Sequence, residues 1–251
     1  MLVSAELPGH DGAVETFDDT EVRRVLAVAA HPDDMEYGGS AAVAAWTARG
    51  VHVSYALVTS GEAGMDSVPP ERAGPLREAE QRAACDAVGV QDLVFLGFPD
   101  GVLEYGLDLR RTIASEVRRV RPDLVVTGAF RDTWPGGYLN QADHVAVGRA
   151  VLDAVRDAGN RWVFREQLVE GVEPWGGVRT VLALGSPQAT HAIAVDDTFE
   201  AAVASLEAHR EYLAALGDGT TQARELLEQI LGHAGPAVGV RYAVSAEVFR
   251  I

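Results

Sequence analysis

The chain has 251 residues, of which 47% are apolar and 23% charged, so it can bury a full core and is expected to form one domain. Its formal charge of −16 repels polyanions, which argues against a protein that binds nucleic acid or is held on anionic lipid. A neutral or cationic small molecule is the partner that this charge favours.

Cys85 is the one cysteine of the sequence, which excludes an intramolecular disulfide and a thiolate metal cluster and predicts a reducing compartment, the cytoplasm. Met1–Asp19 lacks the basic and apolar regions of a secretory signal, and no run of eighteen apolar residues occurs, so neither a signal nor a membrane span is expected. Residues 1–20 are predicted to be a polar lead-in to a single domain that takes up residues 1–251.

Short apolar runs alternate with helical patterns in the first part of the chain. Val25–Ala30 is almost wholly apolar and stops at His31, as a strand buried on both faces does. Ser40–Arg49 carries alanines on one face and is followed by Gly50, which predicts a helix. The elements predicted next are the strand His52–Thr59, the helix Glu71–Val88, the strand Leu93–Leu96, the helix Leu107–Val120, the strand Leu124–Thr127 and the helix Ala142–Asp157.

This alternation predicts right-handed βαβ units, and therefore an α/β fold with a Rossmann-like, mostly parallel sheet flanked by helices. In the commonest doubly wound order, the first and fourth strands are neighbours at the crevice where ligands bind. The loop Gly128–Gln141 follows the fourth strand at that edge. His31 and His144 are therefore expected to face each other across the crevice.

The rest of the chain is predicted to complete the same domain, because no repeat or linker separates it. Trp162–Gly177 is rich in Gly, Trp and Glu and is predicted to be an irregular loop over the site. The elements expected after it are the strands Arg179–Leu184, His191–Val195 and Tyr242–Phe249 and the helices Thr198–Leu216 and Thr220–His233.

The motif Ala30-His31-Pro32-Asp33-Asp34-Met35-Glu36 follows the first predicted strand directly. Neighbouring carboxylates on a turn point in different directions, so Asp34 can bind a metal while Asp33 faces the metal's water as a general base. The plainer alternative is that one carboxylate caps the following helix and that His31 is a hydrogen-bonded turn residue.

A second motif, Asn140-Gln141-Ala142-Asp143-His144, ends the loop after the fourth predicted strand. A zinc ion in a hydrolase takes three protein ligands and leaves one position open for water, and His31, Asp34 and His144 supply such a set. The alternative is again capping, with Asp143 as the N-cap and His144 as an ordinary residue of the first turn. The two motifs together favour the metal site.

In this order, the motifs resemble those of the LmbE-like or PIG-L family of N-deacetylases, over nearly the whole chain. The first motif, with Gly38-Gly39 after it, is similar to the family's opening motif. The further similar stretches are the Arg-x-x-Glu helix from Arg77 to Gly89-Val90, the substrate-edge loop Phe95–Gly101, the strand Arg121–Val126, and Val195-Asp196 with Leu206–Arg210 near the closing helix.

The resemblance implies a Rossmann-like fold without a nucleotide, Zn²⁺ bound by His31, Asp34 and His144, and Asp33 as the base. It also implies hydrolysis of an N-acyl bond, with acetate released, in a small polar molecule such as an amino sugar, a thiol conjugate or a natural-product intermediate. The sequence disfavours a nucleotide-binding dehydrogenase independently, because His-Pro-Asp-Asp stands where Gly-x-Gly-x-x-Gly is needed.

One position departs from the family pattern. The second motif of the family usually reads His-Pro-Asp-His, and its first histidine polarises the scissile carbonyl or protonates the leaving amine, but this chain has Gln141 there. A glutamine amide can donate a hydrogen bond to an oxyanion but cannot carry a proton. The acid role is then expected to pass to Asp33, Tyr138 or His191. The alternative is a zinc-retaining binding or regulatory protein with lost or weak catalysis.

The remaining candidates are assigned by their segments. Arg77, Asp100 and Tyr138 are the expected substrate contacts, although Arg77 also fits a solvated helix residue and Asp100 a turn former. Glu36 and Asp143 are expected to orient metal ligands through hydrogen bonds. For His191 and His209 a structural role is the simpler interpretation. The sequence leaves the oligomeric state open, and a homo-oligomer is compatible with it.

Overall fold

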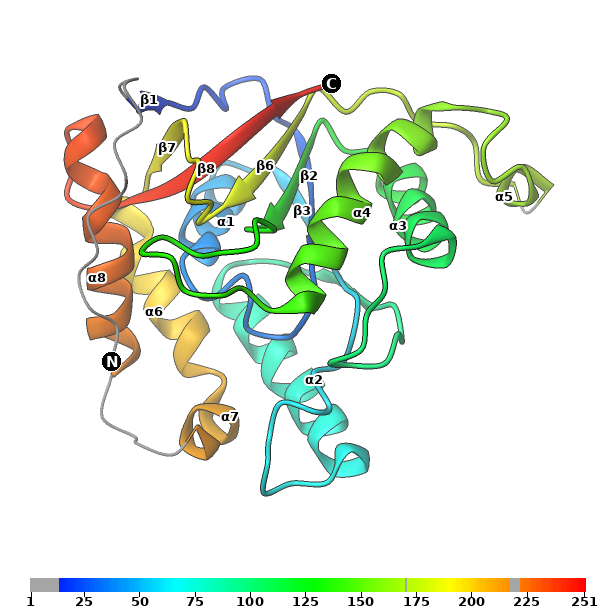
Figure 1. Ribbon diagram of the computed structural model, residues 1–251. Coiled ribbons are helices and arrows are strands. Elements are labelled where there is room, and N and C mark those ends of the chain that lie inside the picture. Colours follow the sequence, from blue (N-terminus) through cyan, green and yellow to red (C-terminus); the bar gives the residue numbers. More distant parts are fainter. Residues whose placement is uncertain (1–13, 170, 217–221) are drawn as a thin grey trace.

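The structure, a computed structural model, describes residues 14–169, 171–216 and 222–251. One eight-stranded sheet in the order β1-β7-β8-β6-β5-β2-β3-β4 runs through it, with helices on both faces (Figure 1). The strands are β1 (Glu15–Thr16), β2 (Arg24–Ala29), β3 (His52–Leu57), β4 (Asp92–Phe95), β5 (Leu124–Gly128), β6 (Thr180–Leu184), β7 (His191–Ala194) and β8 (Ala243–Arg250).

The helices are α1 (Gly39–Ala48), α2 (Pro70–Ala87), α3 (Leu107–Val120), α4 (Ala142–Gly159), α5 (Glu166–Val169), α6 (Phe199–Glu207), α7 (Arg210–Ala215) and α8 (Ala223–Ala234). The described residues also form two short 3₁₀ turns, η1 (Asp196–Thr198) and η2 (Gly235–Val238). The predicted α/β fold class is confirmed, since the sheet is parallel apart from β8, which pairs antiparallel with β6 and β7.

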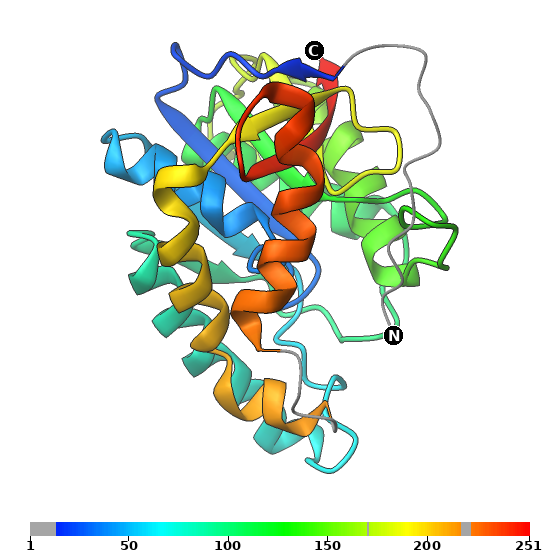
Figure 2. The ribbon, with the colours of Figure 1, turned by 90° about the vertical axis from the view of Figure 1, so that its left-hand side faces the viewer.

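Strand β2 lies between β3 and β5 and is parallel to both, as predicted for the first and fourth apolar runs. Its side chains alternate between two cores. Val25, Ala27 and Ala29 pack in the core that α1, α6 and α8 cover, and Figure 2 shows α6 and α8 side by side on that face. Leu26 and Val28 pack in the core formed with α3 and α4. Burial on both faces explains why β2 is a continuous apolar run.

The turn after β2 depends on glycine. Gly38 has φ of 124°, a conformation that residues with a Cβ rarely adopt. A Cβ on Gly39 would lie 2.7 Å from the Met35 side chain and 2.8 Å from that of Leu184. The two glycines therefore let α1 begin close against this turn, which fixes the loop that carries His31 and Asp34.

The predicted helix Thr198–Leu216 is wrong in one respect, because it is two helices. The amides of Ala208 and His209 donate hydrogen bonds to the carbonyls three residues earlier, instead of four as in an α-helix. This tighter turn ends α6. The Glu80 carboxylate then accepts the amide of Glu211 at 2.6 Å and starts α7. The helix predicted at Thr220–His233 corresponds to α8, and Thr220 and Thr221 lie outside the described residues.

The prediction that Trp162–Gly177 covers the crevice is also wrong. This segment, which includes α5, lies at the far end of α4, where the Trp175 indole donates to the Pro122 carbonyl at 2.8 Å, just before β5. Buried Arg118 holds it there by donating to carbonyls that include those of Ala158 and Val163. Because α4 has 18 residues, about 27 Å separates this segment from the helix end that carries His144.

The end of the predicted polar lead-in joins the sheet, since Glu15–Thr16 pairs with His191 and Ala192 as an edge strand. Residues 1–13 of that lead-in lie outside the described residues. Among the helices that are described, each is too short or too polar to cross a membrane.

Candidate metal centre

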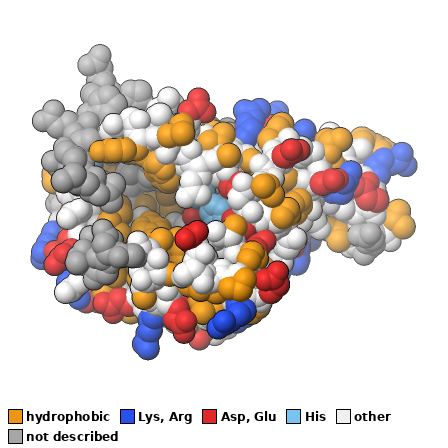
Figure 3. Space-filling view, turned by 60° about the horizontal axis from the view of Figure 1, so that its bottom comes forward, with side chains coloured by type: hydrophobic (Ala, Val, Ile, Leu, Met, Phe, Trp, Pro, Cys, Tyr) orange, Lys and Arg blue, Asp and Glu red, His pale blue; other side chains and the backbone are white. Residues whose placement is uncertain are grey.

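The carboxyl ends of β2 and β5 bring the two predicted motifs together. His31 and Asp34 lie on the loop after β2, and His144 is the third residue of α4, which follows the loop after β5. The ring centroids of His31 and His144 are 5.2 Å apart. Figure 3 shows a small histidine surface, with acidic side chains beside it, near the middle of the face that is turned to the viewer.

The distances among the three side chains fit one shared cation. Oδ1 of Asp34 lies 3.0 Å from Nε2 of His144 and 3.6 Å from Nδ1 of His31, and the three ligand atoms all lie within 4.8 Å of one another. Tetrahedral zinc ligands at about 2.0–2.1 Å from the ion are separated from each other by about 3.3 Å. Two nitrogen donors and one carboxylate oxygen are also the donor types that zinc accepts.

Asn140 determines which ring nitrogen of His144 faces the position of the shared cation. Its amide nitrogen donates to the carbonyls of Ala129 at 2.8 Å and Arg131 at 3.0 Å, so its oxygen must face the other way. That oxygen lies 2.9 Å from Nδ1 of His144, which therefore carries the proton. Nε2 of His144 is left with its lone pair directed towards Asp34, the tautomer that a metal ligand needs.

His31 is oriented from the opposite side. Its Nε2 lies 3.0 Å from Asp100 and 3.3 Å from Asp143, so its Nδ1 faces Asp34. Burial disfavours the charged form of His31 and by itself would lower its pKa. The hydrogen bonds with Asp100 and Asp34 have the larger combined effect and raise the pKa of His31 to about 11. Asp143 is itself held by the amides of Gly101 at 2.8 Å and Leu103 at 3.0 Å. These contacts tie the loop after β4 to the candidate ligand.

Asp34 and Asp33 have opposite surroundings although they are adjacent. Burial would raise the pKa of Asp34, but the imidazoles of His144 and His31 lower it well below the usual range. Burial raises the pKa of Asp33 to about 7 in spite of the opposing charge of Arg77. Asp34 is thus suited to stay ionised as a ligand, and Asp33 to exchange a proton near neutral pH.

Arg77 lies behind Asp33 and is only 2% exposed. The alternative interpretation of Arg77 as a solvated helix residue is therefore wrong. Its guanidinium donates to Oδ1 of Asp33 at 3.1 Å, to the Pro32 carbonyl at 2.6 Å and to the Gly61 carbonyl at 3.0 Å. It also stacks over the ring of Tyr212, with 3.8 Å between its central carbon and the ring centroid. Oδ2 of Asp33 is buried and has no hydrogen-bond partner among the described residues.

Of the other predicted site residues, one is buried and two are exposed at the surface. Glu36 is wholly buried behind the turn, where it accepts a hydrogen bond from Gln81 at 3.2 Å. Gln141 is exposed as the N-cap of α4, and Tyr138 is 46% exposed on the preceding loop. The Trp134 ring meets that of His144 edge to face, at 5.7 Å between centroids, and forms a wall of the site.

His191 does not reach the site, so it cannot take over the acid role. It begins β7, four strand spacings or about 19 Å from β2, where its Nδ1 contacts the Thr190 hydroxyl at 2.8 Å. The roles of Asn140, Gln81 and Tyr212 are absent from the sequence prediction. For Asn140 the motif that contains it gave a signal, whereas Gln81 and Tyr212 come near Asp33 only through the packing of α2 and α7.

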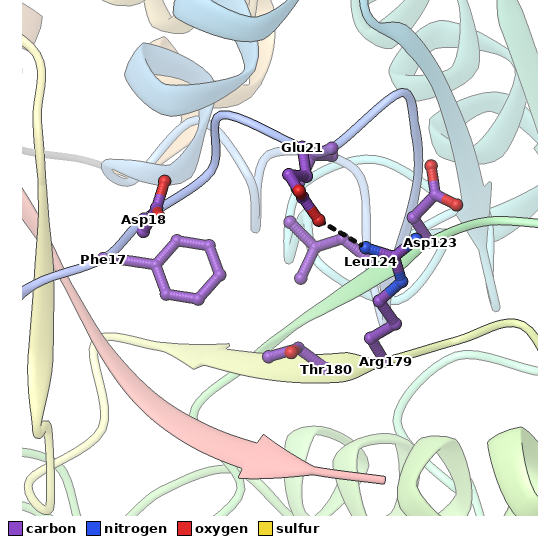
Figure 4. A pocket seen from close by; sticks show the side chains of 8 residues that line it. Phe17, Asp18, Glu21, Asp123, Leu124, Arg179 and Thr180 are labelled. Carbon is purple, nitrogen blue, oxygen red and sulfur yellow. Dashed lines mark hydrogen bonds and ion pairs between the residues drawn. The ribbon is translucent and has the colours of Figure 1, made fainter.

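A cavity of about 170 Å³ lies at the opposite edge of the sheet, by the first residues of β5 and β6 (Figure 4). Phe17 and Leu124 line it, and Arg179 pairs with Glu21 at 3.0 Å across its mouth. None of the predicted site residues lines this cavity. The candidate site is the cluster of His31, Asp34 and His144 at the carboxyl ends of β2 and β5.

Comparison with known proteins relates the chain to deacetylases. Residues 26–155 match the family described as PIG-L: GlcNAc-PI de-N-acetylase. The chain is 35% identical to a probable N-acetyl-alpha-D-glucosaminyl L-malate deacetylase 2 of Bacillus anthracis, over 53% of this chain and 59% of that protein. It is 31% identical to a 1D-myo-inositol 2-acetamido-2-deoxy-alpha-D-glucopyranoside deacetylase of Geodermatophilus obscurus, over 86% of this chain and 83% of that protein.

A solved structure, N,N'-diacetylchitobiose deacetylase from Pyrococcus horikoshii, superposes with a TM-score of 0.84, covering 92% of this chain and 85% of that one. At 21% identity this likeness concerns the fold. The match to the Bacillus anthracis relative spans about three fifths of that protein's length.

Proposed function

The chain belongs to the PIG-L family, and on that premise we propose that it is a zinc-dependent hydrolase that removes an N-acyl group, in the first place acetyl, from a small polar molecule. The observation that carries the proposal is the convergence of His31, Asp34 and His144 on one point, with Asp33 beside them. Relatives named as deacetylases of amino-sugar compounds make an amino sugar the first substrate class to test, before thiol conjugates and natural-product intermediates.

In this proposal, Nδ1 of His31, Oδ1 of Asp34 and Nε2 of His144 hold the ion. When bound, Zn²⁺ supplies Lewis acidity, which lowers the pKa of a water and polarises the acyl carbonyl. Oδ2 of Asp33, the buried oxygen without a protein partner, is the acceptor for the water's proton. Arg77 holds the other oxygen of the same carboxylate in place.

The later steps fall to Asp33 and Gln141. The amide of Gln141, exposed at the start of α4, is proposed to donate a hydrogen bond to the oxyanion that forms from the acyl carbonyl, a role that its exposure supports. Asp33 then returns its proton to the leaving amine, since a glutamine cannot do so. Of the three predicted substrate contacts, Tyr138 has the exposed side chain, whereas Arg77 and Asp100 bond to Asp33 and His31 and are proposed to orient them.

A second candidate is a zinc-retaining binding or regulatory protein without turnover. Gln141 favours it, because this residue stands where the family pattern has a histidine that carries a proton. General acid–base help is worth about 10²–10⁴-fold in rate, so its loss would slow hydrolysis rather than remove the site. The single cysteine, buried in α2, keeps a reducing compartment such as the cytoplasm as the proposed location.

The test combines metal analysis with amine release. Protein purified without chelator is analysed for zinc by mass spectrometry and is then incubated with a panel of N-acetyl sugars and N-acyl amino compounds. The proposal predicts about one zinc per chain and amine release that disappears in Asp33→Ala. Absence of zinc after reconstitution contradicts the metal site, whereas bound zinc without turnover on any compound supports the second candidate.

A further inference from the structure

A buried polar cluster lies behind Asp33, on the side away from the crevice. Gln81 of α2, Glu36 of the turn, and Ser205 and His209 of the segment around α6 are each at most 1% exposed. Oε1 of Gln81 accepts the amide hydrogen of Asp33 at 2.9 Å. Nε2 of Gln81 donates to Oε1 of Glu36 at 3.2 Å, so one side chain connects the base to the cluster.

The hydrogen bonds fix the orientation of the Gln81 amide. Since a backbone amide only donates, the oxygen of Gln81 must face the amide of Asp33, which leaves the Gln81 nitrogen facing Glu36. Oε1 of Glu36 contacts the Ser205 hydroxyl at 3.2 Å, and Oε2 of Glu36 lies 3.5 Å from Nε2 of His209, where neither of these two atoms has a hydrogen-bond partner among the described residues. The single hydroxyl proton of Ser205 is shared with the Ala84 carbonyl of α2 at 3.0 Å, which ties the cluster to both helices.

Asp33 needs such support because of its backbone. Its φ is 83°, in the left-handed region that residues with a Cβ rarely occupy. Three contacts hold it there, namely the bond from its amide to Gln81, the bond from the Glu36 amide to its carbonyl at 2.8 Å, and the bond from Arg77 to its carboxylate. The first of these depends on Gln81, whose hydrogen bonds among the described residues go to Asp33, Glu36 and Cys85 and to none of the candidate ligands.

We propose that Gln81 is a positioning residue for Asp33, and that the buried Glu36–His209 pair holds Gln81 in the orientation that this requires. The inference rests on the proposed role of Asp33 as the base. It adds a condition to that role: besides Arg77, which bonds the carboxylate, the Gln81 amide of α2 fixes the backbone of Asp33, and residues at the junction of α6 and α7 fix Gln81 through Glu36.

The first experiment compares two buried glutamines. Gln81→Leu removes the acceptor of the Asp33 amide, and Gln167→Leu makes the same change in the remote helix α5, where Gln167 is 4% exposed and donates to the Arg111 carbonyl. For Gln81→Leu we expect kcat to fall about 10- to 100-fold, with KM within twofold and zinc content unchanged, because misplacement by about 1 Å costs that much. For Gln167→Leu we expect lower thermal stability and unchanged kcat.

The second experiment exchanges the two partners. Gln81→Glu keeps an acceptor for the Asp33 amide but places a carboxylate against that of Glu36, so kcat is expected to fall. In the double variant Gln81→Glu with Glu36→Gln, the new amide donates to the new carboxylate, and Ser205 can accept from that amide while still donating to Ala84. We expect the exchange to recover most of the lost kcat, which a loss of stability alone would not produce.

A backbone readout separates this inference from the proposed function. In Gln81→Leu the amide of Asp33 is expected to lose its hydrogen-exchange protection and to shift in the ¹⁵N spectrum of the folded protein, whether or not a substrate is known. An Asp33 amide that is unchanged in that variant overturns the inference, as does an unchanged kcat in an enzyme that Asp33→Ala inactivates. A wild-type chain that binds zinc but is inactive on every substrate counts against the proposed function, and the amide readout still decides whether Gln81 positions Asp33.

Discussion

Two adjacent carboxylates with different surroundings are the chemical centre of the site. Asp34 meets the two imidazoles, which lower its pKa, whereas burial raises the pKa of Asp33 to about 7. These opposite pKa shifts support the proposed division, with Asp34 as ligand and Asp33 as base. One oxygen of Asp33 accepts a hydrogen bond from Arg77, and the other is buried without a hydrogen-bond partner among the described residues, which supports its proposed role as the acceptor for the water's proton.

Substitution of each carboxylate by its amide is expected to separate the two roles. Asp33→Asn should keep the zinc and lose about 10²–10⁴-fold in kcat, because an amide cannot accept the water's proton. Asp34→Asn should lose the zinc, because the charge that balances the ion is removed. Zinc content and amine release measured on both variants test this, and equal zinc loss in the two would contradict the assignment.

Asn140 is the residue that sets the tautomer of His144. Asn140→Leu keeps much of the volume but removes the acceptor for Nδ1, and loss of such an orienting contact typically weakens metal binding about 10- to 100-fold. Competition with a chelating indicator measures the affinity. Asn160→Leu, at the other end of α4, is the control and should leave zinc affinity unchanged.

At the scale of elements, the apolar run of β2, its place beside β5, and the two motifs at their carboxyl ends were predictable from the sequence. Local sequence patterns predict these features, because a strand buried in a parallel sheet is apolar throughout, and the first polar residue after it marks the start of the loop. The contact of Asp143 with His31 agrees with the orienting role expected for Asp143. The contact of Asp100 with His31, the burial of Arg77 and the break at His209 were not predictable. They depend on which helix packs against which loop, and no periodicity encodes that.

The packing of α4 against the loop after β5 controls the position of His144. A Cβ on Gly148 of α4 would lie 2.3 Å from Cβ of Phe130, so Gly148→Ala should displace the helix, lower stability by about 1–3 kcal/mol and weaken zinc binding. Gly232 of α8 has its nearest neighbour at 4.0 Å, so Gly232→Ala should be stabilising by about 0.5–1 kcal/mol, through helix propensity. Urea unfolding compares the two variants, and equal stabilities would contradict the packing argument.

At the scale of the whole molecule, the site joins both halves of the chain. His31 and Asp34 come from the loop after β2, His144 from α4, and the cluster behind Asp33 from α2 and the segment around α6. A cation held at this junction binds the folded state and not the separated segments, so it should stabilise the fold as a whole.

Removal of the metal is therefore expected to lower the melting temperature. At free zinc about 100-fold above its Kd the stabilisation is about 2.7 kcal/mol, which corresponds to roughly 5–10 °C for a domain of this size. Calorimetry with and without EDTA measures the shift. His144→Ala is the control, since it should melt at the same temperature in both conditions, and a full EDTA shift in that variant would place the stabilising ion elsewhere.

The most direct test of the central claim is a crystal structure of the zinc-loaded protein with anomalous data on both sides of the zinc edge. We predict one strong peak within bonding distance of Nδ1 of His31, Oδ1 of Asp34 and Nε2 of His144, with Oδ2 of Asp33 facing a water on the ion. A peak on other acidic side chains, or two imidazoles too far apart to reach the same ion, would contradict the account.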